Sequence, residues 1–153
     1  MRLVKRKRAV RPRFVYRGFG FPVLLLGVPM VQVRGRWTPD VNYEELRSLV
    51  LETLAEKPGC LTGHEVRFVR LAHDLTLTAF AARFGVTHPA VLKWERAGGR
   101  PSGMSWSTEK DIRLFVLSRR PSAPKRFLDS YHRLEEKPRK TSGRISVDTF
   151  GVA

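Results

Sequence analysis

The stretch between residues 77 and 96 constrains the fold of this chain most, because its small and apolar residues are spaced as in two closely packed helices. Ala81 is small enough to let a second helix approach, and four residues later Gly85 can adopt the positive φ of a sharp reversal. Thr87 can cap the helix that follows, and Pro89 falls in its first turn, where a missing N–H does no harm. The space between the two helices would be filled by Phe80, Phe84, Val86, Val91 and Trp94.

A second sequence signal marks the start of the helix before this pair. Thr62 and Glu65 form a capping box, in which each side chain accepts a hydrogen bond from the other residue's backbone N–H. Apolar spacing extends that helix to about His73. A later helix is expected to be capped by Ser107 or Thr108. The helices expected after the capping box lie at about 77–84, 88–96, 108–118 and 124–136.

The first part of the chain has a different pattern. Residues 14–37 are rich in β-branched and aromatic side chains, punctuated by glycines and prolines. This pattern predicts a small antiparallel meander with strands near 14–17, 21–26 and 29–34. A helix at about 41–57, capped by Asp40, is expected to follow. The predicted fold class is therefore α+β, with a small β-meander and one helix ahead of an all-helical domain.

These elements divide the chain into five segments. Residues 1–13 are dense in like charge with few apolar residues, which predicts a disordered basic arm. A β-plus-helix module is expected over 14–57, and 58–60 would link it to a helical domain at 61–118. Residues 119–153 are expected to form a basic, partly disordered tail.

The positive charge of the chain is concentrated at its ends. The 153 residues carry a formal net charge of +15. Residues 1–36 contain ten basic residues and no acid, residues 37–117 are balanced, and residues 118–153 contribute +5. This distribution favours nucleic acid as the partner, ahead of an anionic membrane surface or an acidic protein. The apolar stretch at 19–33 is interrupted and shorter than the roughly 20 residues of a spanning helix, so we expect no membrane partner and a cytoplasmic location.

The run VRFVRLAHDLTLTAFAARFGVTHPAVLKWE, at residues 66–95, resembles the Cro/cI-like (XRE) helix-turn-helix family. The resemblance covers roughly residues 61–117 and implies four or five helices, of which the third enters the major groove of DNA. It also implies an ion pair between Arg70 and Glu95. The alternative is an ordinary helical hairpin with a coincidental glycine turn.

Carried over position by position, the resemblance assigns base contacts to Thr87, His88, Pro89 and Lys93. Lys93 can donate to guanine, or contact phosphate without discrimination, and His88 can donate to a base or phosphate, or simply be solvated. The family commonly has a phosphate-binding Gln where this chain has Leu77. The candidates for phosphate contact are Thr76, Thr78, Arg83, Arg96, Arg100, Lys110 and Arg113. Non-specific attraction is expected from Lys5, Arg6, Lys7, Arg8, Arg11 and Arg13.

The order of the segments is similar to that of two-domain MqsA-type antitoxins of toxin–antitoxin systems. In those proteins an N-terminal module with paired Cys-x-x-Cys motifs holds zinc and binds the toxin. This chain lacks those cysteines, so the resemblance implies only that residues 14–57 bind a toxin or another protein. The aromatic residues of that module would form either a plain core or an interaction face.

No catalytic or metal-binding pattern is present in the sequence. The four histidines have no ligand spacing, and the single cysteine, Cys60, excludes a disulfide framework and Cys-based zinc fingers. We therefore expect no enzyme, no cofactor and no metal. The sequence predicts a DNA-binding transcriptional regulator, acting as a homodimeric repressor on duplex DNA, with an antitoxin as a sub-case. The alternative is a non-specific basic DNA- or RNA-binding protein that acts through its charged arms.

Overall fold

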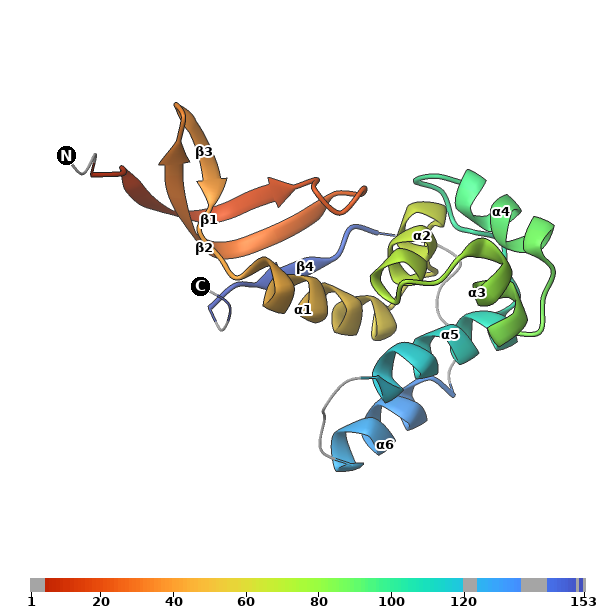
Figure 1. The fold of residues 1–153 in the computed structure, drawn as a ribbon. Helices are drawn as coiled ribbons and strands as arrows, with labels where there is room; N and C mark the ends of the chain where they lie inside the picture. Colours follow the sequence, from red (N-terminus) through yellow and green to blue (C-terminus); the bar gives the residue numbers. More distant parts are fainter. Residues whose placement is uncertain (1–4, 120–123, 136–142, 151, 153) are drawn as a thin grey trace.

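The computed structural model describes residues 5–119, 124–135, 143–150 and 152, which form a four-stranded sheet and six helices (Figure 1). The predicted α+β class is confirmed. In chain order the elements are β1 (Arg8–Tyr16), β2 (Val23–Val33), β3 (Arg36–Pro39), α1 (Tyr43–Ala55), α2 (Gly63–Ala72), α3 (Leu77–Arg83), α4 (His88–Arg96), α5 (Trp106–Ser118), α6 (Pro124–Arg133) and β4 (Ser146–Asp148).

Strand β2 lies at the centre of the sheet and is flanked on both edges. β1 pairs with it antiparallel, from Arg8 opposite Val31 to Tyr16 opposite Val23. The other edge is shared, because β4 runs parallel to the first half of β2 and β3 runs antiparallel to the second half. The sheet therefore combines both ends of the described chain.

A glycine in the middle of β2 explains why one continuous strand replaces two of the expected strands. Gly27 has a φ of +58°, a conformation that residues with a side chain rarely adopt. The fully buried positions are odd-numbered before it and even-numbered after it: Val23, Leu25, Val28 and Met30. Because side chains alternate along a strand, a shift by one position at Gly27 lets both halves of β2 face the core while pairing with β1 continues.

Part of the expected disordered arm is ordered in β1. Residues 8–13 lie beside β2, and the backbone oxygen of Lys7 accepts a hydrogen bond from Gln32 N at 2.9 Å. The side chains of residues 5–13 remain exposed. The expectation of disorder was wrong for residues 8–13, because a strand needs partners for its backbone groups and can leave its charged side chains in water. Residues 1–4 lie outside the described residues.

The C-terminal segment returns to the sheet, which corrects the expectation of a loose tail at 119–153. α6 packs against α5, and β4 then pairs with Leu24 to Leu26 of β2. Val147 is only 3% exposed, and Ile145 and Val152 are also buried. Burial of these apolar side chains stabilises the ordered segment. The net positive charge of the segment had predicted disorder instead. Residues 120–123, 136–142, 151 and 153 of that expected tail lie outside the described residues.

The expected linker at 58–60 is held against α5 through Gly59, although Pro58 is exposed. Arg113 of α5 is 1% exposed and donates to the carbonyl oxygens of Lys57 at 2.5 Å and Gly59 at 2.6 Å. Leu61 N donates to the carboxylate of Glu109, also on α5, at 3.0 Å. Since buried carbonyl groups need hydrogen-bond partners, these contacts fix the connection between α1 and α2. One apolar core continues from the sheet into the helices, so 58–60 is not a flexible boundary.

The helix starts agree with the sequence at Thr62 and at Thr87, and they differ for α1 and α5. The capping box of Thr62 and Glu65 is present, with both reciprocal hydrogen bonds. α1 is capped by Asn42 rather than Asp40, because the Asn42 side chain reaches the N–H groups of the first turn. α5 is capped by Ser105, earlier than the expected Ser107 or Thr108. No helix among the described residues is long and apolar enough to cross a membrane.

The aromatic residues of the N-terminal part belong to the core. Phe19 and Phe21 both pack edge-on against Phe68 of α2, with ring centroids 5.2 and 5.4 Å apart. Tyr16 packs on Phe19 and faces Tyr43 of α1. Burial raises the pKa of Tyr16 and of Tyr43 above the ordinary value, and each hydroxyl therefore stays neutral to higher pH. This arrangement favours the core interpretation of the cluster and joins the sheet to the helical domain.

Candidate nucleic-acid interface

Helices α3 and α4 are joined by a tight turn at residues 84–87, as the sequence pattern predicts. Gly85 has a φ of +65°, and a Cβ built on it would meet no atom within 4 Å. The requirement for glycine is therefore the backbone conformation and not the available space. Val86 N donates to Ala81 O at 2.9 Å, which closes the turn against α3. The Thr87 side chain then caps α4 by accepting from Ala90 N at 3.3 Å.

The inner faces of the two helices are filled by the apolar side chains that the sequence assigned to them. Ala81 is buried where the helices meet. Phe80 packs edge-on against Phe84, with centroids 4.8 Å apart, and Phe84 packs against Phe115 of α5. Val91 and Trp94 are the buried residues of α4. This packing determines which side of α4 is left exposed.

An ion pair connects α4 to α2. Arg70 donates from Nε and Nη2 to the two carboxylate oxygens of Glu95, at 2.9 and 2.8 Å. Arg70 also donates to the carbonyl oxygen of Leu75 at 3.0 Å, so the same side chain holds the segment that precedes α3. Both members of the pair are largely buried, and the two parallel bonds restrict rotation of the helices relative to each other. The pair that the family resemblance implied is therefore present.

Gly63 makes a close contact that the sequence interpretation missed. A Cβ at this position would lie 2.4 Å from the carbonyl oxygen of Trp94 and 2.7 Å from Gly98 N. The start of α2 thus lies against the end of α4, where His64 N donates to Gly98 O at 2.9 Å. The N–H groups that start one helix satisfy carbonyl groups that follow another. The one sequence feature that could have predicted this close contact between α2 and α4 is the glycine inside the capping box.

The outer face of α4 presents polar and basic side chains to solvent. Thr87 at the cap and His88 and Pro89 in the first turn are exposed, and so are Lys93 and Arg96 further along the helix. The structure therefore places the four expected base-contact residues on one short exposed helix. In its first turn Pro89 has no N–H to donate, whereas the Thr87 hydroxyl accepts the capping bond from Ala90 N and keeps its own O–H as a donor.

The residues expected to contact phosphate differ from one another in exposure and in their neighbours. Thr76 caps α3 by accepting from Ala79 N at 3.1 Å, and Thr78 is exposed in the first turn of that helix. Arg96 and Arg100 are exposed near the end of α4. Arg83 is exposed as a residue, but its guanidinium carbon lies 5.1 Å from the ring centroids of Phe84 and Phe115. Leu77, which stands in place of the family's Gln, packs against the core.

Two residues of α5 differ from the expected role. Arg113 is buried by Lys57, Gly59 and Glu109, and its guanidinium donates to Glu109 at 2.7 Å. It cannot contact phosphate, because its side chain is enclosed, so its assignment as a phosphate contact was wrong. Lys110 is half-buried, with its ammonium 5.5 Å from the ring centroid of Tyr131 on α6. The position of these two residues on the helix that follows α4 did not show which basic side chain is buried and which is partly exposed.

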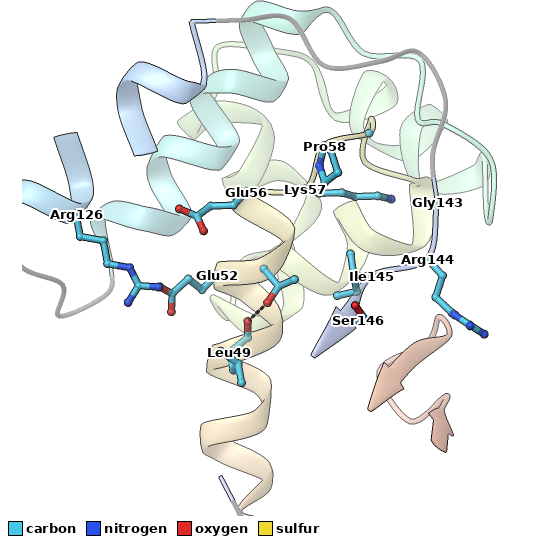
Figure 2. Close-up of a pocket in the computed structure, with 12 residues that line it drawn as sticks. Leu49, Glu52, Glu56, Lys57, Pro58, Arg126, Gly143, Arg144, Ile145 and Ser146 are labelled. Atoms are coloured by element: carbon cyan, nitrogen blue, oxygen red, sulfur yellow. Dashed lines mark hydrogen bonds and ion pairs between the residues drawn. The ribbon is translucent and has the colours of Figure 1, made fainter. Parts of the chain in front are cut away.

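A pocket of about 440 Å³ lies away from α4, between the C-terminal half of α1, α6 and the segment before β4 (Figure 2). Its charged side chains include Glu52, which pairs with Arg126, and Glu56, which pairs with Arg133 at 2.6 Å. These contacts fasten α6 to α1. Among the described residues, no three His, Cys, Asp or Glu side chains are grouped so that they could hold a metal ion.

Comparison of the chain with protein-family models, with curated proteins and with solved structures gives no match.

Proposed function

We propose that this chain is a DNA-binding regulator that places α4 in the major groove of duplex DNA. The observation that carries the proposal is the exposed face of α4, with His88 and Lys93 pointing away from a helix that is fixed on its inner side. The Arg70–Glu95 pair and the close contact at Gly63 hold α4 rigidly. A rigid, exposed helix that carries hydrogen-bond donors suits base recognition in the major groove.

In this proposal the protein binds DNA and catalyses no reaction. We propose that it represses transcription as a homodimer in the cytoplasm, with two α4 helices on half-sites about one helical turn apart. Direct base recognition would rest on His88 and Lys93, because Pro89 offers only an apolar surface. Indirect recognition of DNA shape would then contribute to specificity.

Selection from a pool of randomised duplexes at about 200 mM salt tests the proposal, because attraction to phosphate alone is weak there. The protein should enrich a sequence and prefer it to a scrambled duplex. The variant His88→Ala/Lys93→Ala should lower that preference by about 10- to 100-fold. The matched control His132→Ala/Lys125→Ala removes the same residue types from the exposed face of α6 and should leave the preference unchanged. Absence of enrichment, or a preference that survives loss of His88 and Lys93, would refute the proposal.

A further inference from the structure

Exposed basic residues line the outer strand β1, from Arg8 opposite Val31 to Arg13 opposite Leu26, and continue onto the turn that joins β2 to β3. Gln32 N donates to Lys7 O, so residues 5–7 lie beside the turn that joins β2 to β3. That turn contributes two further arginines. We call this surface the basic edge, and its residues are Lys5, Arg6, Lys7, Arg8, Arg11, Arg13, Arg34 and Arg36.

Every side chain of the basic edge is exposed, and almost no charge compensates it. The chain has no acidic residue before Asp40, and Asp40 contacts Arg8 at 3.6 Å in a solvent-exposed pair. Among the described residues, Lys7, Arg11, Arg13 and Arg34 form no ion pair with an acid. Such a surface attracts a polyanion over a distance of several ångströms.

The edge of β1 is poorly suited to pairing with another strand. No strand of the described residues pairs with its outer side, and Pro12 has no N–H to donate to one. A second copy of the same strand would bring arginines face to face, and like charges directly opposite are destabilising. Proline and positive charge are the features by which edge strands resist such pairing. Binding through the backbone of β1 is therefore unfavourable. Binding through its exposed basic side chains is the alternative.

The charge of the basic edge matches a uniform line of negative charge better than it matches a protein surface with charges of both signs. Specific protein interfaces match charges of both signs, whereas this surface has only one. Arginine dominates it, and a guanidinium binds phosphate through two hydrogen bonds. A single-stranded nucleic acid would need exposed aromatic rings for stacking. The aromatic rings of this region, Phe14, Tyr16, Phe19 and Trp37, pack against the core.

We propose that the basic edge is a second surface that binds the phosphate backbone of duplex DNA without regard to sequence. It is separate from α4: in Figure 1 the strands β1–β3 lie on one side of the molecule and α3 and α4 on the other, with α1 and α2 between them. The helical residues 61–117 carry a net charge of only +3. The basic edge therefore supplies affinity that α4 lacks, and it does so whether or not α4 recognises a sequence.

The test is the salt dependence of binding to a random duplex. The variant Lys7→Gln/Arg11→Gln/Arg13→Gln/Arg34→Gln should make the slope of log K against log salt shallower by about 2 to 4, because each lost phosphate contact removes about 0.9. The matched control Arg47→Gln/Arg119→Gln/Lys125→Gln/Arg144→Gln removes the same formal charge from exposed positions elsewhere and should change the slope by less than about 1. The two-residue variant Lys7→Gln/Arg34→Gln gives half the expected change if the larger set disturbs β1.

The outcomes separate this inference from the function proposed for α4. The four-residue variant should retain any preference for a selected sequence, whereas His88→Ala/Lys93→Ala should change the slope by no more than about 1 and lower the preference by about 10- to 100-fold. An equal slope change in the matched control would show a general charge effect and would overturn the basic edge. Tighter binding to single-stranded DNA, or equal competition by polyglutamate at the same charge concentration, would overturn the assignment to duplex DNA.

Discussion

Arg70 on α2 and Glu95 on α4 are joined by two parallel hydrogen bonds of 2.9 and 2.8 Å in a largely buried position. The two residues are 25 positions apart, and the turn between α3 and α4 lies between them in sequence. Because the same arginine also bonds Leu75 O, one side chain fixes α2, the start of α3 and the end of α4. The orientation of the exposed face of α4 depends on this contact.

Removal of Arg70 should destabilise the protein strongly. Arg70→Met leaves the carboxylate of Glu95 buried without its partner, and breaking a buried pair in this way costs about 3 to 5 kcal/mol. The free energy of unfolding, measured by urea denaturation, should fall by that amount. Arg67→Met is the control, because Arg67 is 63% exposed and 3.9 Å from Glu95, and it should cost less than about 1 kcal/mol. Equal effects of the two variants would contradict a dominant role for Arg70.

A methyl group at position 63 should force α2 and α4 apart. The Cβ of Gly63→Ala would lie 2.4 Å from the backbone oxygen of Trp94, and backbone cannot move aside as a side chain can. We expect a loss of about 1 to 3 kcal/mol in the free energy of unfolding, as in overpacked sites. Gly99→Ala is the matched control, because its Cβ would meet nothing within 4 Å, and thermal unfolding should distinguish the two. A Gly63→Ala protein as stable as the control would show that the contact is absent.

The C-terminal strand should contribute directly to stability. Val147→Asp places a charge at a buried position of β4 and should lower the free energy of unfolding by about 3 kcal/mol or more. Ser146→Asp, at the neighbouring exposed position of the same strand, should change it by about 0.5 kcal/mol or less. If both substitutions have the same small effect in denaturant titrations, β4 is not part of the core.

Stability should decline at alkaline pH in a way that depends on Tyr16. Burial raises the pKa of Tyr16 in the folded protein above the value of about 10 expected for the unfolded chain. Its contribution is therefore fully present below about pH 10 and is lost as the pH rises towards the folded-state pKa, because the unfolded chain ionises first. Tyr16→Phe keeps the ring and removes the titrating hydroxyl, so its stability should fall less between pH 9 and 11 than that of the unsubstituted protein. Identical pH profiles in denaturant titrations would contradict this account.

The α3–α4 pair could be predicted from sequence because its requirements are local. Gly85 supplies a backbone conformation, Thr87 supplies a cap, and both act within a few residues of their own position. The buried face of α4 followed from helical spacing in the same way. Arg113 shows the limit of this reasoning, because helical spacing cannot tell that carbonyl groups of a distant segment will surround a basic side chain.

The sequence by itself determined the helices, their turn and the apolar residues between them, since propensity, capping and periodicity are properties of neighbouring residues. Only the tertiary structure decided that basic residues 8–13 form a strand and that β4 completes the sheet, because both depend on hydrogen-bond partners far away in the chain. The gathering of residues 5–8 beside Arg34 and Arg36 has the same origin. Strand pairing is non-local. The basic residues that the sequence suggests as a disordered arm therefore form a defined surface only because β1 pairs with β2.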